Sequence, residues 1–319
     1  MATAATPLFR DPIFDGAADP TIVFNRGEKT WWIVYTNRRA NVDCRGVAWA
    51  HGTDIGIASS LDFGASFTYR GTLKGLEFEK GRNTFWAPEI VHHDGTYHMY
   101  VSYVSGVPHD WSGGRSILHY VSDNLWDWEF QSRLALSSER VIDACVERMP
   151  SGIWRMWYKD ETNGSYTYAA DSNNLYSWEV VGPVITDCKH EGPNVFRACG
   201  YYWMLTDPWE GLAVYRSSDA ENWQRQAGIL RAGGSRPDDV GIGRHADVLT
   251  VDGHAYAFYF THPGRARNEE PEETEDGSIP YRQRRSSLNV VELLVRDNVL
   301  TCDRDAPVEL CLESRDNWG

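Results

Sequence analysis

Five segments of the chain open in the same way, with an acidic or polar residue followed by a short apolar run. Each opening precedes a strand-like stretch rich in aromatic residues, such as TWWIVYT (residues 30–36) or TYHMYVSY (residues 96–103), and four of the repeats then reach a Ser/Asp-rich turn. Repeats of about 40–60 residues, each holding about four short strands, are typical of β-propellers. We therefore predict an all-β fold, a five-bladed β-propeller whose four-stranded antiparallel blades surround a central axial pocket.

The repeats also set the limits of the predicted blades, near residues 17–75, 84–135, 141–186, 190–232 and 243–302. Because all five segments share one pattern, residues 17–302 are expected to form a single propeller domain rather than two separate cores. Residues 1–16 are then an N-terminal extension, and residues 303–319 are a C-terminal tail that closes the propeller or packs on it.

The charge of the chain bears on its partners. A net charge of −14 repels nucleic acid and anionic membrane surfaces, so neither is expected as a partner. The first residues lack the regions of a secretory signal and no run is long enough for a membrane helix, which predicts a cytoplasmic protein unless a signal has been removed. The six cysteines are scattered, without the spacing of metal-binding fingers. None of these features indicates the oligomeric state.

Carboxylates stand at the openings of several repeats. Asp19 precedes a proline, Asp143 lies within an apolar stretch, and Glu191 is followed by Gly-Pro. Alone, Asp19 could cap a turn and Asp143 could be a buried acid with a partner. At equivalent positions of five blades, however, these side chains should converge on one axial pocket. Carboxylates gathered at a concave site are the equipment of glycoside hydrolysis, which predicts an oligosaccharide substrate.

In these motifs the chain resembles the five-bladed propeller glycosidases of glycoside hydrolase family 43 and its relatives, over about residues 17–302. The resemblance rests on Asp19-Pro20, on Trp86-Ala87-Pro88-Glu89, and on Glu191-Gly192-Pro193 followed by Gly200-Tyr201-Tyr202. It implies that Asp19 is the general base, that Glu191 is the general acid, and that Asp143 orients this acid and adjusts its pKa. It also implies that His245 lies near a central metal.

Two departures mark the chain as a divergent branch. Ala144 follows Asp143 where the family usually has proline, and Arg244 stands directly before His245 where the family usually has glycine. The substrate therefore cannot be carried over from the parent family.

The acid and base predict an inverting mechanism. Asp19, facing solvent in the pocket, would take a proton from the attacking water, and Glu191 would protonate the leaving oxygen. The negative charge of Asp143 and burial would raise the pKa of Glu191 and keep it protonated near neutral pH. Retaining relatives open with Trp-Met-Asn-Asp-Pro-Asn, whereas residues 17–21 read AADPT, which favours inversion. We expect an exo-acting glycosidase that removes a terminal furanose or pentose sugar from short oligosaccharides.

Other residues have candidate roles around this site. His190 competes with Glu191 as the acid because imidazole has a suitable pKa, although neighbouring strand residues point to opposite faces. No cofactor is required for the chemistry, and a structural calcium or another hard cation is expected near His245. The residues expected to contact the sugar are Trp86, Arg38, His51, Arg244 and Arg285.

Two alternative functions keep the fold. A propeller phosphorylase would hold inorganic phosphate with a basic cluster, for which Arg244, His245 and residues 282–285 are available, but it does not need a base at Asp19. A carbohydrate-binding propeller without catalysis would keep the aromatic residues and has no use for a separated acid and base.

Overall fold

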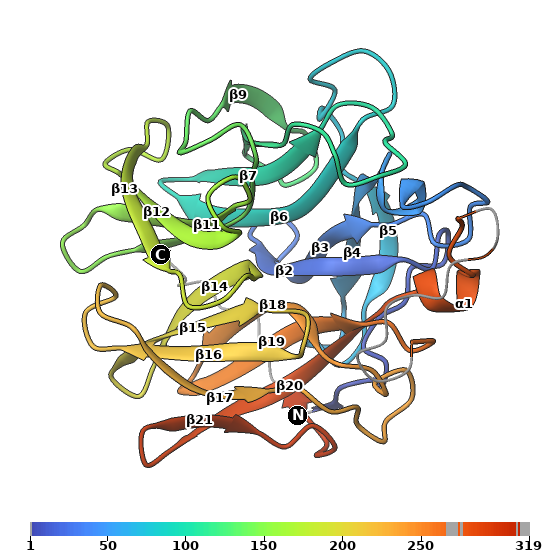
Figure 1. Cartoon of the computed structure of the whole chain (residues 1–319). Coiled ribbons are helices and arrows are strands. Elements are labelled where there is room, and N and C mark those ends of the chain that lie inside the picture. Colours follow the sequence, from blue (N-terminus) through green and yellow to red (C-terminus); the bar gives the residue numbers. More distant parts are fainter. Residues whose placement is uncertain (1, 266–273, 275–276, 311, 313–319) are drawn as a thin grey trace.

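The computed structural model describes residues 2–265, 274, 277–310 and 312. Within this part of the chain, five four-stranded antiparallel sheets surround a central axis like the blades of a propeller (Figure 1). Each sheet takes its strands in chain order, so every blade is one contiguous segment. The predicted fold class is confirmed, and the sheets lie within the five predicted segments.

The strand bounds are as follows. Blade 1 consists of β2 (Ala17–Asn25), β3 (Thr30–Asn37), β4 (Asp54–Ser60) and β5 (Thr68–Thr72). Blade 2 consists of β6 (Thr84–His93), β7 (Thr96–Val104), β8 (Ser116–Ser122) and β9 (Glu129–Arg133). Blade 3 consists of β10 (Val141–Arg148), β11 (Trp154–Asp160), β12 (Tyr166–Ser172) and β13 (Glu179–Ile185). Blade 4 consists of β14 (Glu191–Ala198), β15 (Tyr201–Asp207), β16 (Leu212–Ser217) and β17 (Gln224–Ile229). Blade 5 consists of β18 (Arg244–Val251), β19 (His254–Thr261), β20 (Ser287–Arg296) and β21 (Val299–Cys302).

Short elements accompany the blades. Near the two ends of the chain, β1 (Ala2–Thr3) pairs with β22 (Glu309–Leu310). A 3₁₀ turn, η1 (Ala48–Ala50), and the helix α1 (Tyr281–Arg284) lie in connections. Residues 311 and 313–319 of the expected C-terminal tail lie outside the described residues. Among the helices that the structure describes, none is long and apolar enough to cross a membrane.

The core lies between the blades. Trp32, Trp157 and Trp203, from the second strands of blades 1, 3 and 4, are fully buried. One apolar cluster joins blades 1 and 2, and another joins blades 4 and 5. Because neighbouring blades cover both faces of a sheet, the inner strands read as aromatic and apolar runs rather than as a strict alternation.

The innermost strand of every blade carries a β-bulge at the same register. Ala18 pairs with Thr36 and Thr21 pairs with Val34, so two residues of β2 lie opposite one residue of β3. The same shift recurs in β6, β10, β14 and β18. A bulge bends its strand and turns side chains in a new direction. The first residues of the five bulges are Asp19, Ala87, Asp143, Gly192 and His245.

Two stacked histidines are buried in blade 2. The ring centroids of His98 and His119 are 5.2 Å apart, and Nδ1 of His98 lies 3.0 Å from Nε2 of His119. Burial lowers the pKa of His98 to about 4, and burial together with the charge of His98 lowers the pKa of His119 to about 3. Both rings are therefore neutral at physiological pH.

We expect this pair to weaken the fold in acid. An unfolded chain binds these protons near pH 6.5 and the folded chain only at lower pH, so the free energy of unfolding falls between those values as the pH drops. His119→Gln should reduce that fall by about 2 kcal/mol. Urea unfolding at pH 7.5 and 4.5 measures it, and His254→Gln, at an exposed histidine, is the control. A fall as large as in the wild type would contradict the prediction.

Candidate active site

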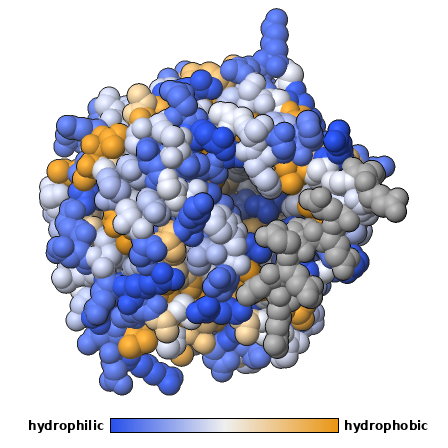
Figure 2. Space-filling view, in the orientation of Figure 1, coloured by the Kyte–Doolittle hydropathy of each residue, from blue (hydrophilic) through white to orange (hydrophobic). Residues whose placement is uncertain are grey.

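A pocket opens at one end of the axis, where the bulged strands meet. Its volume is about 920 Å³, and Figure 2 shows it as a hollow near the centre of that face. Flat aromatic surfaces in its wall come from Trp49, Trp86, Trp111 and Trp209. The charged groups in its wall are Asp19, Asp143, Glu161, Glu191, Arg38, Arg115, Arg140, Lys159, Arg244, His245 and Arg265.

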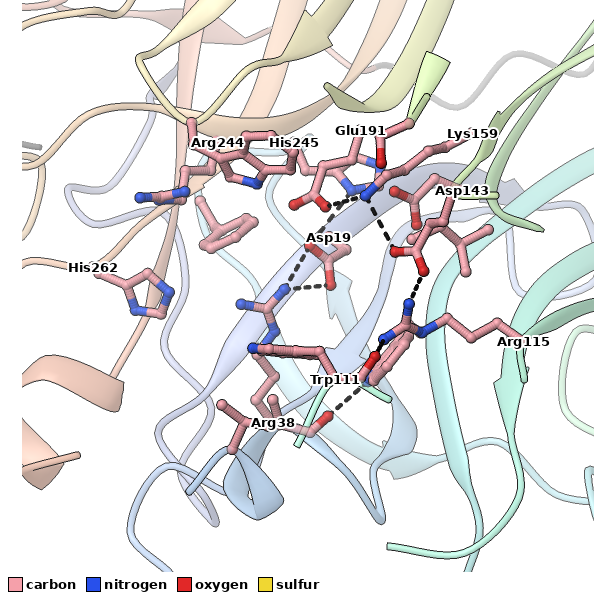
Figure 3. A pocket seen from close by; sticks show the side chains of 18 of the residues that line it. Asp19, Arg38, Trp111, Arg115, Asp143, Lys159, Glu191, Arg244, His245 and His262 are labelled. Carbon is pink, nitrogen blue, oxygen red and sulfur yellow. Dashed lines mark hydrogen bonds and ion pairs between the residues drawn. The ribbon is translucent and has the colours of Figure 1, made fainter. Parts of the chain in front are cut away.

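Asp19 and Asp143 are the bulge residues of blades 1 and 3. Their φ angles are +46° and +59°, in the left-handed region that residues other than glycine rarely adopt. Such strain persists only where the surrounding structure imposes it, and it is frequent at functional sites. Figure 3 shows both carboxyl groups among the side chains that line the pocket.

The sequence repeat suggested that Glu191 and Asp19 have equivalent positions in their blades, but the structure shows that they do not. Gly192 is the bulge residue of blade 4, and Glu191 lies one residue before it, at the register of Arg244 in blade 5. Gly192 has a φ of +57°, and a Cβ there would come within 2.8 Å of the His245 ring. Glycine therefore leaves room for His245, while the preceding residue supplies the carboxylate.

Asp19 is buried and ion-paired rather than open to solvent, which corrects the expectation from the sequence. Nη2 of Arg38 lies 3.0 and 2.9 Å from its two carboxylate oxygens, and Nδ1 of His245 lies 3.5 Å from Oδ1. Burial alone would raise the pKa of Asp19, but Arg38 and His245 outweigh it and hold the pKa well below its usual range. Asp19 is therefore ionised at neutral pH.

Asp143 has the opposite electrostatic environment. Its carboxylate accepts a hydrogen bond of 3.1 Å from the Gly192 N–H. Burial raises the pKa of Asp143 to about 6. The positive charge of His245 lowers this pKa, and the negative charge of Glu191 raises it further. The protonation of Asp143 is thus linked to that of Glu191.

Glu191 is paired with Lys159, a residue that the sequence reasoning missed. Nζ of Lys159 lies 3.1 Å from Oε2 of Glu191, and the two side chains are 4% and 28% exposed. Burial would raise the pKa of Glu191, but the charge of Lys159 outweighs it and the pKa is lowered. The expected rise in the pKa of Glu191 is therefore wrong.

The position of Lys159 explains why it is free to pair with Glu191. In three blades a polar side chain of the second strand accepts the bulge N–H of the next blade: Thr36 from Ala87, Ser102 from Asp143, and Asp207 from His245. Lys159 holds this position in blade 3, and an ammonium group cannot accept a hydrogen bond. The equivalent residues of the other blades are Thr36, Ser102, Asp207 and Phe260, none of which is basic. A lysine at this position was the signal in the sequence.

His245 is a positive charge surrounded by carboxylates. Burial would lower its pKa, but the hydrogen bond with Asp19 and the charges of Asp143 and Glu191 raise it to about 9. A metal ligand must be a neutral imidazole. Among the described residues, no three His, Cys, Asp or Glu side chains form a group of metal ligands. A cation bound to this ring would have to displace its proton, and the calcium expected here stays a prediction.

His190 lies outside the pocket wall. It is fully buried, with Nε2 2.6 Å from Oγ1 of Thr167 and Nδ1 2.9 Å from the carbonyl oxygen of Cys188. Glu191, its neighbour, faces the pocket. Successive strand residues point to opposite sides, so the structure removes His190 as a candidate acid.

The predicted sugar contacts divide into two groups. Trp86, Arg38 and Arg244 line the pocket. His51 does not, because it is buried behind Trp86, with ring centroids 4.9 Å apart. Arg285 does not either, because it forms ion pairs with Asp238 and Asp15.

The wall formed by blades 2 and 3 was also missed. Glu161 forms ion pairs with Arg115 and Arg140, and Trp111 is 53% exposed. Trp111 lies in the long connection between β7 and β8, whose sequence alone does not show which side chains turn inward.

Comparisons with known proteins identify related folds. Neither protein-family models nor curated proteins match the chain. Among solved structures, a thermostable family-43 glycoside hydrolase has a TM-score of 0.66 at 16% identity, over 97% of this chain and 100% of that chain. A GH43 β-xylosidase/α-arabinofuranosidase from a compost microbial metagenome, in complex with xylotriose, has a TM-score of 0.68 at 13% identity, over 95% and 98%. A GH43 β-1,3-galactosidase with galactodeoxynojirimycin has a TM-score of 0.64 at 14% identity, over 95% and 98%. At these identities the likeness establishes the five-bladed fold.

Proposed function

We propose that the protein is a glycoside hydrolase that removes a terminal sugar from short oligosaccharides with inversion. The observation that carries this proposal is the meeting of three carboxyl groups from blades 1, 3 and 4 in one pocket with aromatic walls. Their environments differ, as acid–base catalysis on a glycoside requires. The structural relatives named above act on xylosides, arabinofuranosides and galactosides, which supports the same class of reaction here.

Asp19 acts as the general base in this mechanism. It is ionised and held by Arg38 and His245, so it can orient a water molecule and accept its proton. Glu191 acts as the general acid, because it is the most exposed of the three carboxyls and faces the pocket. Asp143 tunes Glu191 through its charge and fixes the backbone of Gly192.

Glu191 must hold a proton when it donates, so its pair with Lys159 has to loosen first. Nζ of Lys159 also lies 3.3 Å from Oε1 of Glu161, which provides an alternative partner for the ammonium group. A substrate that displaces Lys159 toward Glu161 would let burial raise the pKa of Glu191. The ion pair therefore couples proton uptake to substrate binding.

The place of the pocket supports a substrate class. It lies where the bulged strands meet, which favours entry of a chain end over passage of a polymer. A terminal furanose or pentose, such as arabinofuranose or xylose, suits this space. Incubation with aryl glycosides and short oligosaccharides, followed by product chromatography and proton NMR of the released anomer, tests the proposal. Mixed-length products would refute exo action, and retention of configuration would refute the inverting mechanism.

The two other functions have separate readouts. A phosphorylase would turn over only with inorganic phosphate, yet Arg284 and Arg285 make their contacts outside the pocket, with Val42 and Asp238. A binding module would hold oligosaccharides and release no product from any of them.

Removal of the Lys159 charge should shift the pH dependence of turnover. Lys159→Met is expected to raise the pKa of Glu191, because an opposite charge within about 4–6 Å lowers a carboxyl pKa by about 1–3 units. A general acid works only when protonated, so the alkaline limb of the kcat/KM profile should move to higher pH. Lys80→Met, at an exposed lysine, is the control. An unmoved limb would show that Glu191 is not the titrating acid.

A further inference from the structure

Arg244 lies in the pocket wall, next to the bulge of blade 5. It stands directly before the bulge of blade 5, at the register that Glu191 has in blade 4 and Trp86 has in blade 2. All three side chains line the pocket. The bulge therefore places the Arg244 side chain in the pocket wall as well, and Figure 3 shows its guanidinium on the side of His262, apart from the three carboxyl groups.

The guanidinium of Arg244 has neither a hydrogen bond nor an ion pair with any residue that the structure describes. The charge of Arg244 acts on Asp207, but the carboxylate oxygens of Asp207 are directed at backbone groups. Oδ1 of Asp207 accepts a hydrogen bond of 2.7 Å from the Trp209 N–H, and Oδ2 of Asp207 accepts one of 3.2 Å from the His245 N–H. Five donors of Arg244 are thus available to a ligand.

The other cationic side chains of the pocket wall have partners. Arg38 pairs with Asp19, Lys159 pairs with Glu191, and Arg115 and Arg140 share Glu161. Arg265 donates to the carbonyl oxygen of Gln283, and His245 contacts Asp19. Arg244 differs from them, because its guanidinium has no ion pair among the described residues.

We propose that Arg244 binds a carboxylate on the terminal sugar, so that the preferred substrate is an oligosaccharide ending in a uronic acid. This inference rests on the proposed glycosidase function. A uronic acid in its pyranose form is a pentopyranose ring with a carboxylate on C5, so it needs little more room than a pentose. A planar guanidinium matches a carboxylate with two parallel hydrogen bonds.

His262 supplies a second recognition group on the same side. Its Nδ1 lies 2.9 Å from the carbonyl oxygen of Arg285, so this nitrogen carries the hydrogen and Nε2 is left as an acceptor. His262 lines the pocket and is neutral, because burial holds its pKa well below the usual value. A hydroxyl next to the sugar carboxylate can donate to Nε2 while Arg244 holds the carboxylate.

The test compares sugars that differ only in the carboxylate. Binding of D-glucuronate, D-glucose and D-xylose, and of D-galacturonate, D-galactose and L-arabinose, is titrated by NMR, and kcat/KM is measured on the corresponding 4-nitrophenyl glycosides. The acidic member should bind about 10- to 100-fold more tightly than its neutral partners. Arg244→Gln should remove this preference, and Arg244→Lys should keep part of it. Arg296→Gln, which removes an equal charge at an exposed position, is the control and should keep all of it.

The outcomes separate this inference from the proposed function. Binding preference for the acids without turnover of any glycoside would sustain the carboxylate site and sink the glycosidase. Turnover of neutral glycosides with no preference for the acids, in binding or in kcat/KM, would sink the carboxylate site alone. Turnover that requires phosphate, with a KM for phosphate that rises strongly in Arg244→Gln, would assign Arg244 to a phosphate ion instead and overturn the inference.

Discussion

Asp19→Asn should abolish turnover. An amide cannot take a proton from the attacking water, and acid–base assistance is typically worth about 10²–10⁴-fold in rate. The change also removes the negative charge between Arg38 and His245, so a binding measurement must accompany the kinetics. We expect kcat on a short oligosaccharide to fall by at least that factor, with the sugar still bound.

Asp94→Asn is the matched control, because the side chain of Asp94 is 87% exposed in a turn far along the blade from the bulge. It should keep full activity. An Asp19→Asn enzyme that retains more than about a tenth of the wild-type kcat would contradict the assignment of Asp19 as the base.

Glu191→Gln should have an effect that depends on the leaving group. Natural glycosides have poor leaving groups that need a proton, so their hydrolysis should fall by about 10²–10⁴-fold. 4-Nitrophenyl glycosides leave without much protonation and should lose far less. The ratio of the two losses, measured from kcat/KM, is the signature of a general acid.

Two further variants make this experiment decisive. Glu179→Gln changes an exposed glutamate at the start of β13 and should alter neither substrate class. His190→Gln should leave the leaving-group dependence unchanged, because both ring nitrogens are held by Thr167 and Cys188. Equal losses on both substrate classes in Glu191→Gln would mean that this residue does not protonate the leaving oxygen.

The sequence predicts the propeller well because the signal is repeated five times. Aromatic strands, turns and polar openings recur at a fixed spacing, and each copy supports the others. The same repetition predicted that Asp19 and Asp143 lie near one axis, and both line the pocket. It failed at Glu191, which was aligned with them although the bulge lies at Gly192. A register shift of one residue is set by backbone hydrogen bonds and leaves little trace in composition.

The electrostatics of the site depend on contacts that no single repeat contains. Lys159 comes from the second strand of blade 3 and meets Glu191 from blade 4, so the lowered pKa of Glu191 arises between blades. The ion pair of Arg38 with Asp19 lies within blade 1, but the pattern of the repeat did not reveal this contact either. His51 and Arg285 have side chains that could contact a sugar, but neither lines the pocket. His51 packs behind Trp86, and Arg285 pairs with Asp238.

The ring of blades has a seam. Every blade is a contiguous segment, so none of the described strands is exchanged between blade 5 and blade 1. The circle is closed there by side-chain contacts and short bridges, together with the pairing of β1 and β22 near the chain ends. Asp247 of blade 5 accepts the Ile22 N–H of blade 1, Arg38 lies 4.8 Å over the ring of Phe260, and Asp19 meets His245 across the same boundary. Asp19, the base of the proposed reaction, is thus one of the residues that join blade 5 to blade 1. A sugar that contacts both blades would therefore also stabilise the contact between blade 5 and blade 1.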